Sequence, residues 1–242
     1  MRVRHRPRPR LEGKSQSGLT LVELVVAILL LSLVLAVATS FLIGAMRTVS
    51  LTQVTSQGAG LASNLMNELS RVIRAGDDNP NAGSLAPTPA FVPSASPTAE
   101  SLTIFSNIDS YDGSSTFQTR PSMVQFLLDQ TTRMLIEKRW LPTSSAGGIF
   151  TFPAVTSAPS TTRTIGGPVL AASSTPNTSD PLFAYIDLHG NVLTPPLSAS
   201  QLPTIAAVVV TVRTQGGSSA STSATVLQST IRLPNLGFTT GP

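Results

Sequence analysis

Residues 17–24 read SGLTLVEL and begin an apolar run that continues to Met46. Between Leu24 and Met46 there is no charged side chain, and a helix of that length spans roughly 35 Å at about 1.5 Å per residue. The hydrocarbon core of a bilayer is about 30 Å thick, so this run can cross it with some tilt. Glu23 lies at the start of the run, where an ionised side chain costs on the order of 3 kcal/mol. The sequence therefore predicts a membrane-spanning helix with a carboxylate that needs a partner.

The segment GLTLVEL at residues 18–24 resembles the processing site of type IV prepilins and pseudopilins, usually written Gly-Phe-Thr-Leu-Ile-Glu. The resemblance implies that a prepilin peptidase cuts after Gly18 and that Leu19 becomes the N-methylated amino terminus. It also implies that Glu23 neutralises the terminal ammonium of a neighbouring subunit, so that two charges that are separately expensive in an apolar bundle become one pair. Leu19 departs from the family, which most often has Phe there, although minor pilins and pseudopilins commonly tolerate other apolar residues.

The same resemblance implies a set of partners and a location. The partners are the prepilin peptidase, other pilin or pseudopilin subunits, a membrane-embedded assembly platform and the lipid bilayer, and no cofactor is implied. The expected location is a single-pass cytoplasmic membrane protein with its C-terminal domain outside the cytoplasm, which enters an extracytoplasmic filament on assembly.

The first 18 residues hold most of the positive charge of the chain. Six basic residues against the single acid Glu12 give this leader a net charge of +5, while the whole chain carries +4, so the remainder is near −1. Basic residues before a membrane helix favour a cytoplasmic leader and translocation of the rest. The leader offers no helical face and no aromatic side chain for stacking on bases, so we predict no direct contact with nucleic acid.

Two other interpretations of the N-terminus remain open. Ala36-Val37-Ala38 before Thr39 resembles a signal-peptidase site, and an ordinary signal anchor would also fit the apolar run. Under either one the protein is a secreted or membrane-tethered binding protein with no filament role. The signal-peptide interpretation leaves Glu23 unexplained inside an apolar region that is longer than usual.

The helix is expected to continue from about Leu19 to about Ala75. Apolar or small residues recur every three or four positions and form one face of an amphipathic helix: Val54, Gly58, Leu61, Leu65, Leu69 and Val72. Ala75-Gly76, followed by Pro80, predicts its end. The leucine-rich run from Leu61 to Ala75 is similar to the corresponding helix of J-type pseudopilins and W-type minor pilins, and so is the Phe-x-Tyr-x-Asp-x-x-Gly pattern at residues 183–190. This similarity implies a minor subunit that primes assembly or lies near the filament tip.

Residues 77–100 are rich in Pro, Ala, Ser and Asn and predict a loop. Strand signals follow at 101–105, 123–129, 133–140, 149–152, 183–187, 205–214 and 224–233, with hairpins expected at 130–132 and 215–219. The predicted fold class is α+β, with a long N-terminal helix packed against an antiparallel sheet. The predicted segments are a leader at 1–18, a membrane or filament-core helix at 19–46, its amphipathic continuation at 47–76, a loop at 77–100 and a β-rich pilin-like domain at 101–242.

No catalytic site emerges from the sequence. The chain has no cysteine, which excludes disulfides, thiol catalysis and Cys-ligated metals. His5 belongs to the leader, and His189 sits in an Asp-Leu-His-Gly segment typical of a solvated turn. Asp109 and Asp112 could begin a calcium loop, but the further acids of an EF-hand are missing, so a plain turn is favoured. We therefore predict no enzyme activity, no catalytic residue and no metal site.

Overall fold

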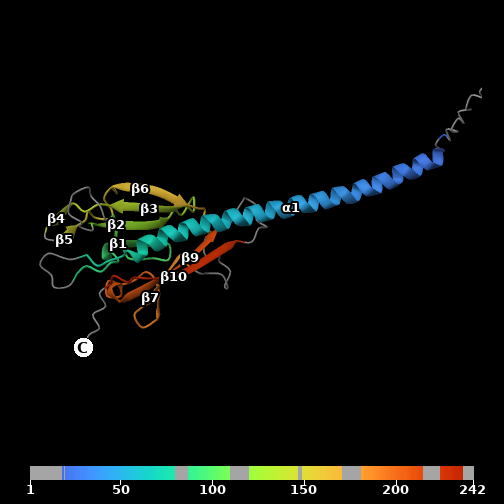
Figure 1. The fold of residues 1–242 in the computed structure, drawn as a ribbon. Helices are drawn as coiled ribbons and strands as arrows, with labels where there is room; N and C mark the ends of the chain where they lie inside the picture. Colours follow the sequence, from blue (N-terminus) through green and yellow to red (C-terminus); the bar gives the residue numbers. More distant parts are fainter. Residues whose placement is uncertain are drawn as a thin grey trace, which may run out of the picture. The chain divides into compact units, whose positions relative to one another are not determined.

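The computed structural model of the protein describes residues 18, 20–79, 87–109, 120–146, 149–170, 181–214 and 224–236. The chain divides into two compact units, Met1–Ser50 and Leu51–Pro242. One helix, α1 (Leu21–Arg74, 54 residues), runs through both, which agrees with the predicted limits of Leu19 and Ala75. Ten strands and two short 3-10 helices, η1 (Pro93–Ala95) and η2 (Leu202–Thr204), follow it in the second unit (Figure 1). The predicted α+β class is confirmed.

Within the second unit, the C-terminal part of α1 buries the face that the sequence pattern predicts. Gly58, Leu65, Leu69 and Val72 are buried, and the polar residues of the opposite face are mostly exposed. Gly76 lies two residues after the end of α1, and a Cβ atom placed on it would lie 2.6 Å from Ile104 Cδ1 and 2.9 Å from the carbonyl oxygen of Ile73. Only glycine therefore allows the end of the helix to approach β1 this closely.

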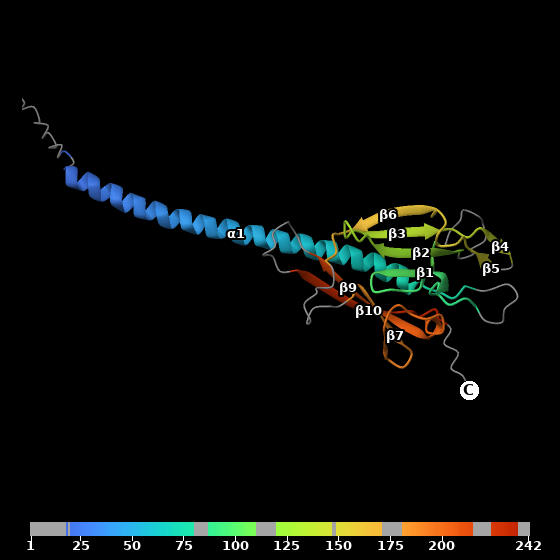
Figure 2. The same ribbon diagram turned by 180° about the vertical axis from the view of Figure 1, so that it is seen from behind.

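The described strands form three antiparallel sheets. The first sheet has the order β1-β2-β3-β6, and its strands are β1 (Ser101–Asp109), β2 (Arg120–Leu128), β3 (Leu135–Trp140) and β6 (Thr161–Gly166). The second sheet has the order β10-β9-β7-β8, and its strands are β7 (Phe183–Asp187), β8 (Val192–Leu193), β9 (Ile205–Thr214) and β10 (Thr225–Arg232). The third sheet pairs β4 (Ser144–Ala146) with β5 (Ile149–Thr151). Figures 1 and 2 show the second half of α1 running beside both larger sheets.

One hydrophobic core joins the helix and the two larger sheets. It contains Leu65 and Ile73 from α1, inward-facing residues of the first sheet such as Phe126, and Phe183 and Tyr185 from the second. Because the core draws on all three elements, none of them buries its apolar face alone. A smaller cluster contains Val92, Phe105, Met123 and Trp140, the single tryptophan of the sequence.

Residues 87–100, here called the linking segment, connect the two larger sheets. On one side Phe91 forms an isolated antiparallel bridge with Ile104 of β1. On the other side the amide of Phe183 donates to the carbonyl of Ala99 at 3.0 Å, and the hydroxyl of Tyr185 donates to the carbonyl of Thr98 at 3.1 Å. The rings of Phe91 and Tyr185 meet edge to face at 6.1 Å. The segment is therefore part of the packed interior, although it was expected only as a loop.

The number of sheets differs from the prediction. The sequence predicts one sheet, and the structure has two four-stranded sheets and a two-stranded one. The strands β4, β6 and β8 were not predicted. β6 reads TTRTIG and exposes four of its six residues, so it carries no alternation of apolar and polar side chains. The predicted hairpins 123–140 and 205–233 are found as the antiparallel pairs β2–β3 and β9–β10. The residues expected to join the second pair, 215–219, lie outside the described residues.

A cluster of ion pairs joins α1 to the first sheet. Glu68 of α1 pairs with Arg71, at 2.6 Å, and with Arg163 of β6. Arg163 also pairs with Glu137 of β3 at 2.6 Å, and Glu137, whose side chain is only 2% exposed, pairs with Arg139 at 3.0 Å. The buried carboxylate is thus compensated by two guanidinium groups, as burial of a charge requires.

This cluster predicts a loss of stability in acid. The Arg71 guanidinium, which donates a hydrogen bond to Glu68, holds the pKa of Glu68 below its ordinary value of 4.5. A carboxyl group whose pKa is lowered by folding stabilises the native state above its ordinary pKa, and this contribution is lost as the pH falls through the folded-state value. We expect Glu68→Gln to cost about 1 kcal/mol at neutral pH and to make the fall in stability below pH 4.5 shallower.

The measurement is denaturant unfolding of the full chain in detergent across this pH range. Asn67→Ala, at the neighbouring exposed position of α1, removes no ion pair and serves as the matched control. An acid transition of Glu68→Gln that matches the unsubstituted chain would contradict the assignment.

Candidate processing and assembly site

The residues at the predicted cleavage site lie just before α1. Gly18 is exposed, and a Cβ atom placed on it would meet nothing within 4 Å. Its φ angle also lies outside the left-handed region. Within the described part of the chain, therefore, neither packing nor backbone conformation requires glycine at this position. The other predicted processing residue, Leu19, lies outside the described residues.

Glu23 and Thr20 form a capping box at the start of α1. The Oε2 atom of Glu23 accepts hydrogen bonds from the backbone amide and the hydroxyl of Thr20, each at 2.9 Å, while the amide of Glu23 donates to the Thr20 hydroxyl at 3.3 Å. This is the reciprocal pattern that satisfies the free amides of a helix N-terminus. A carboxylate in the first turn is also favoured by the helix dipole.

The carboxylate of Glu23 retains capacity for a further donor. Both hydrogen bonds from Thr20 go to Oε2, and Oε1 accepts none from the described residues. Glu23 was expected to need a partner, whereas the part that Thr20 plays was not predicted. The signal was present, because the spacing Thr-x-x-Glu before an apolar run is the sequence pattern of a capping box.

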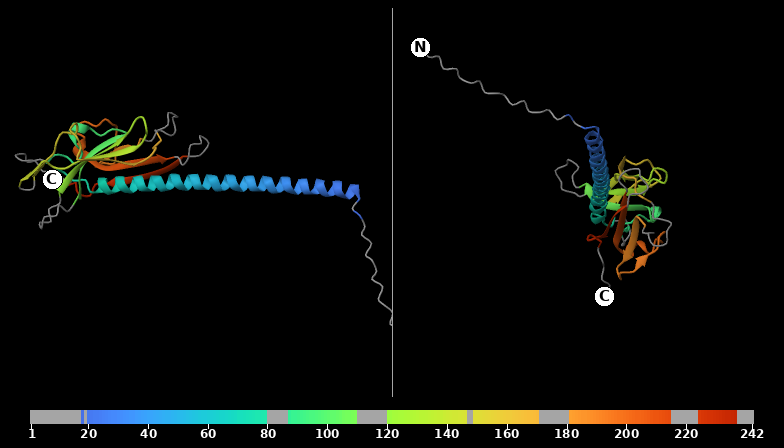
Figure 3. Two further views of the ribbon diagram at one scale, coloured as in Figure 1. Left: turned by 90° about the horizontal axis from the view of Figure 1, so that it is seen from above. Right: turned by 90° about the vertical axis from the view of Figure 1, so that its right-hand side faces the viewer.

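The first part of α1 presents an apolar surface on all sides. Residues 21–50 are exposed, and they include 18 large hydrophobic side chains between Leu21 and Val49. The hydroxyls within this run bond to carbonyls of their own helix, as Ser32 does to Leu29 at 2.8 Å and Thr39 to Leu35 at 2.8 Å. Such bonding meets the requirement that polar groups in lipid be satisfied internally. By length and composition this helix can cross a membrane, and the left panel of Figure 3 shows it from the side.

The helix is continuous through the alternative cleavage site. Ala36, Val37 and Ala38 lie inside α1, and the hydroxyl of Thr39 is bonded back to the same helix. The other candidate residues do not form a site. His189 is in an exposed turn, where the Asp187 carboxylate accepts its amide at 2.8 Å. Asp109 ends β1, and Asp112 lies outside the described residues. No group of three potential metal ligands occurs in the described part of the chain.

Comparison with known proteins agrees with this geometry. Residues 13–39 match the family model described as the prokaryotic N-terminal methylation motif. The match covers Gly18, Glu23 and most of the apolar run, and it supports a type IV pilin-like protein that prepilin peptidase processes. Proteins of this class are structural subunits rather than enzymes, anchored by an N-terminal apolar helix. Searches of curated proteins and of solved structures find no match.

Proposed function

We propose that the protein is a structural minor subunit of a type IV pilus or of a type II secretion-like pseudopilus. In this proposal it is made as a precursor, cut by prepilin peptidase after Gly18, N-methylated at Leu19 and assembled with other pilin or pseudopilin subunits through a membrane-embedded platform. The observation that carries the proposal is the match to the methylation motif at residues 13–39, on a helix whose side chains are apolar all round.

Two local observations support the assignment of the site residues. Gly18 is exposed with open space around it, which leaves its backbone accessible to a peptidase. Glu23 has one carboxylate oxygen bound to Thr20 and the other without a donor, which leaves room for the ammonium group of a neighbouring Leu19. The pairing of these charges inside a helix bundle offsets the cost of burying either one.

The role as a minor subunit rests on the sequence of the second unit. The run Leu61–Ala75 and the pattern at residues 183–190 are similar to J-type pseudopilins and W-type minor pilins. Such a subunit primes assembly or lies near the tip. The corresponding division of the chain is leader 1–18, membrane and filament-core helix 19–46, amphipathic helix 47–76, loop 77–100 and pilin-like domain 101–242.

The N-terminal peptide of the mature protein tests the proposal directly. We expect the protein from its native cell to begin at Leu19 with one added methyl group on its amino nitrogen. Mass spectrometry of the N-terminal peptide measures this. A peptide that begins at Thr39 would instead identify a secreted protein cut by signal peptidase, and an intact leader would identify a plain membrane anchor. Either of these would refute the filament assignment.

A further inference from the structure

The outer face of the second sheet is unusually apolar for an exposed sheet surface. Side chains alternate along each strand, and those of Phe183, Tyr185, Val208, Val210 and Ile231 point into the core. The opposite positions form two cross-strand rows: Ile186, Ala207 and Arg232, and Ala184, Val209 and Thr230. A sheet face in contact with water normally carries polar side chains. Here four of the six positions are aliphatic.

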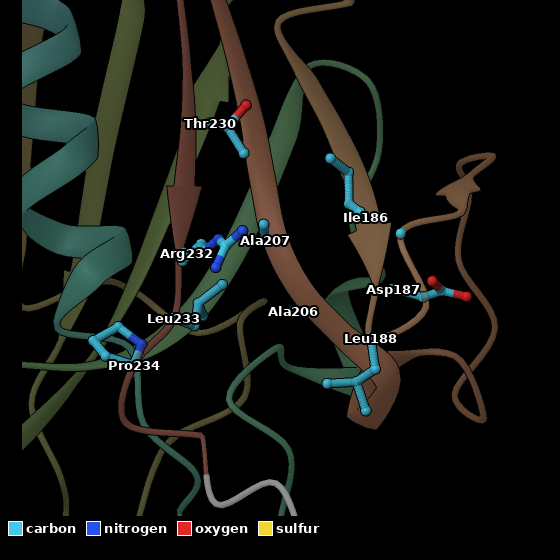
Figure 4. A pocket seen from close by; sticks show the side chains of 10 residues that line it. Ile186, Asp187, Leu188, Ala206, Ala207, Thr230, Arg232, Leu233 and Pro234 are labelled. Atoms are coloured by element: carbon cyan, nitrogen blue, oxygen red, sulfur yellow. The ribbon is translucent and has the colours of Figure 1, made fainter.

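A groove crosses this face and is bordered by exposed apolar side chains. It has a volume of about 400 Å³ and is lined by Ile186, Leu188, Ala207, Thr230 and Arg232, among others (Figure 4). Leu188 is 49% exposed, and Val192, which pairs with Ile186 across β7 and β8, is 71% exposed. Exposed aliphatic residues that continue a groove indicate a surface that a partner covers.

Two arginines flank the same groove without an ionic partner. Arg74, the last residue of α1, and Arg232, the last residue of β10, line an adjoining hollow together with Thr230 and Pro234. Neither guanidinium has a hydrogen bond or ion pair with the described residues, whereas Arg71, Arg133, Arg139 and Arg163 all pair with carboxylates. Asp187 also lines the groove, but its side chain points away from Arg232 (Figure 4) and accepts hydrogen bonds from His189 and Asn191. The groove and the adjoining hollow thus combine an apolar floor with two positive charges that no described residue compensates.

We propose that this groove, defined by Arg74, Ile186, Ala207, Thr230 and Arg232, receives a different pilin-like subunit that presents a carboxylate beside an aliphatic strip. Charge complementarity favours such a partner, because a carboxylate placed on two unpaired guanidiniums forms charge-assisted hydrogen bonds. Arginine at the edge of an apolar patch is also the composition typical of protein interfaces.

Among the described acids of the second unit, the engaged carboxylates favour a partner other than a second copy. In the second unit, each carboxylate whose surroundings the structure describes already accepts a hydrogen bond or ion pair within the chain: Glu68, Asp77, Asp78, Glu100, Asp129, Glu137 and Asp187. A copy of the chain therefore brings no unengaged carboxylate from these residues. The proposal assigns the carboxylate to the partner, and it rests on the proposed filament function for the class of protein that supplies it.

The test uses the full-length protein in its native cell. A photo-crosslinking amino acid is placed at Thr230 in the groove and, as a control, at Thr162 on the exposed strand β6 of the other sheet. The charge test is the double variant Arg74→Glu/Arg232→Glu. Its matched control is Lys138→Glu, because Lys138 pairs in register with Thr162 and also has no ionic partner among the described residues. Crosslinked peptides are identified by mass spectrometry, and the mass of the N-terminal peptide is measured in the same samples.

We expect Thr230, but not Thr162, to crosslink to a second protein that carries its own prepilin-type N-terminus. The double variant should lower the yield about tenfold or more, because like charges replace complementary ones, and Lys138→Glu should leave it unchanged. Replacement of a carboxylate at the crosslinked site of the partner by a positively charged residue should restore the crosslinking yield of the double variant.

Several results would overturn the inference. These are a product that contains two copies of this chain, a product with lipid alone, a yield that does not respond to the double variant, and no product at all from a chain that begins at Leu19 and fractionates with filaments. The last of these would refute the groove while leaving the proposed function intact. A chain that begins at Met1 or Thr39 would instead refute the proposed function.

Discussion

Gly18→Trp is expected to abolish removal of the leader. A Cβ atom at this position would meet no described atom within 4 Å. The substitution should therefore leave the fold and membrane insertion unchanged. Its effect should appear only when a peptidase must approach the backbone. The precursor should then persist with residues 1–18 attached, and the ammonium of Leu19 should never form.

The measurement is the size and N-terminal mass of the protein from the native cell. Gly13→Trp provides the matched control, because Gly13 lies five positions before Gly18 in the proposed leader. We expect Gly13→Trp to be processed normally and Gly18→Trp to accumulate as full-length precursor in the membrane fraction. A Gly18→Trp chain with the same electrophoretic size as the unsubstituted mature protein would rule out cleavage after Gly18.

Glu23→Ala is expected to block incorporation into filaments after normal processing. Removal of one partner from a buried ion pair typically costs 3–5 kcal/mol, because the remaining charge stays buried without compensation. That range corresponds to a loss of incorporation of roughly a hundredfold or more. The substitution also removes the capping bond to Thr20, which contributes about 1 kcal/mol to the helix terminus.

Two further variants separate the charge from the cap. Thr20→Ala removes the capping partner and keeps the carboxylate, so it should incorporate nearly as well as the unsubstituted chain. Glu23→Gln keeps an oxygen that can accept from Thr20 but removes the charge, so it should fail as Glu23→Ala does. Quantification of each variant in sheared filaments against the membrane pool measures incorporation. If Thr20→Ala fails while Glu23→Gln assembles, Glu23 acts through the helix cap and not as an ionic partner.

The helix was predictable from the sequence because its signals are local. The uncharged run to Met46, the four-and-three spacing from Val54 to Val72 and the stop at Gly76 each depend on neighbouring residues. They locate both ends of α1 to within two residues. The strands rich in β-branched or aromatic residues, such as β7 and β9, were predicted for the same reason.

The sheet topology depends on contacts that no local pattern records. β6 is mostly exposed and polar, and it is held in place by pairing with β3 and by Arg163, which bonds to Glu68 and Glu137 from two other elements. The linking segment looked like a loop because its proline and alanine content is high. Phe91 is nevertheless completely buried, since its partners come from both sheets. Long-range contacts, and not the local propensity of the residues, therefore determine the structure of β6 and of the linking segment.

In the candidate site, too, the local features were predictable from the sequence and the long-range contacts were not. Gly18, Leu19 and Glu23 followed from a short motif, and the family model agrees with the segment that contains them. The contact between Glu23 and Thr20 was within reach of the sequence, because it spans three residues. The groove near Arg74 and Arg232 was not, because it brings together residues 158 positions apart whose lack of partners is visible only in three dimensions.

The linking segment also sets an order of events during synthesis. It emerges from the ribosome before any strand does, yet the hydroxyl of Tyr185 that bonds to Thr98 belongs to a residue made 87 positions later. At translation rates of about 5–20 residues per second, that delay is roughly 4–17 s. Until β7 docks, the ring of Phe91 has no second sheet to cover it. Docking of β7 is therefore the step that completes burial of the linking segment.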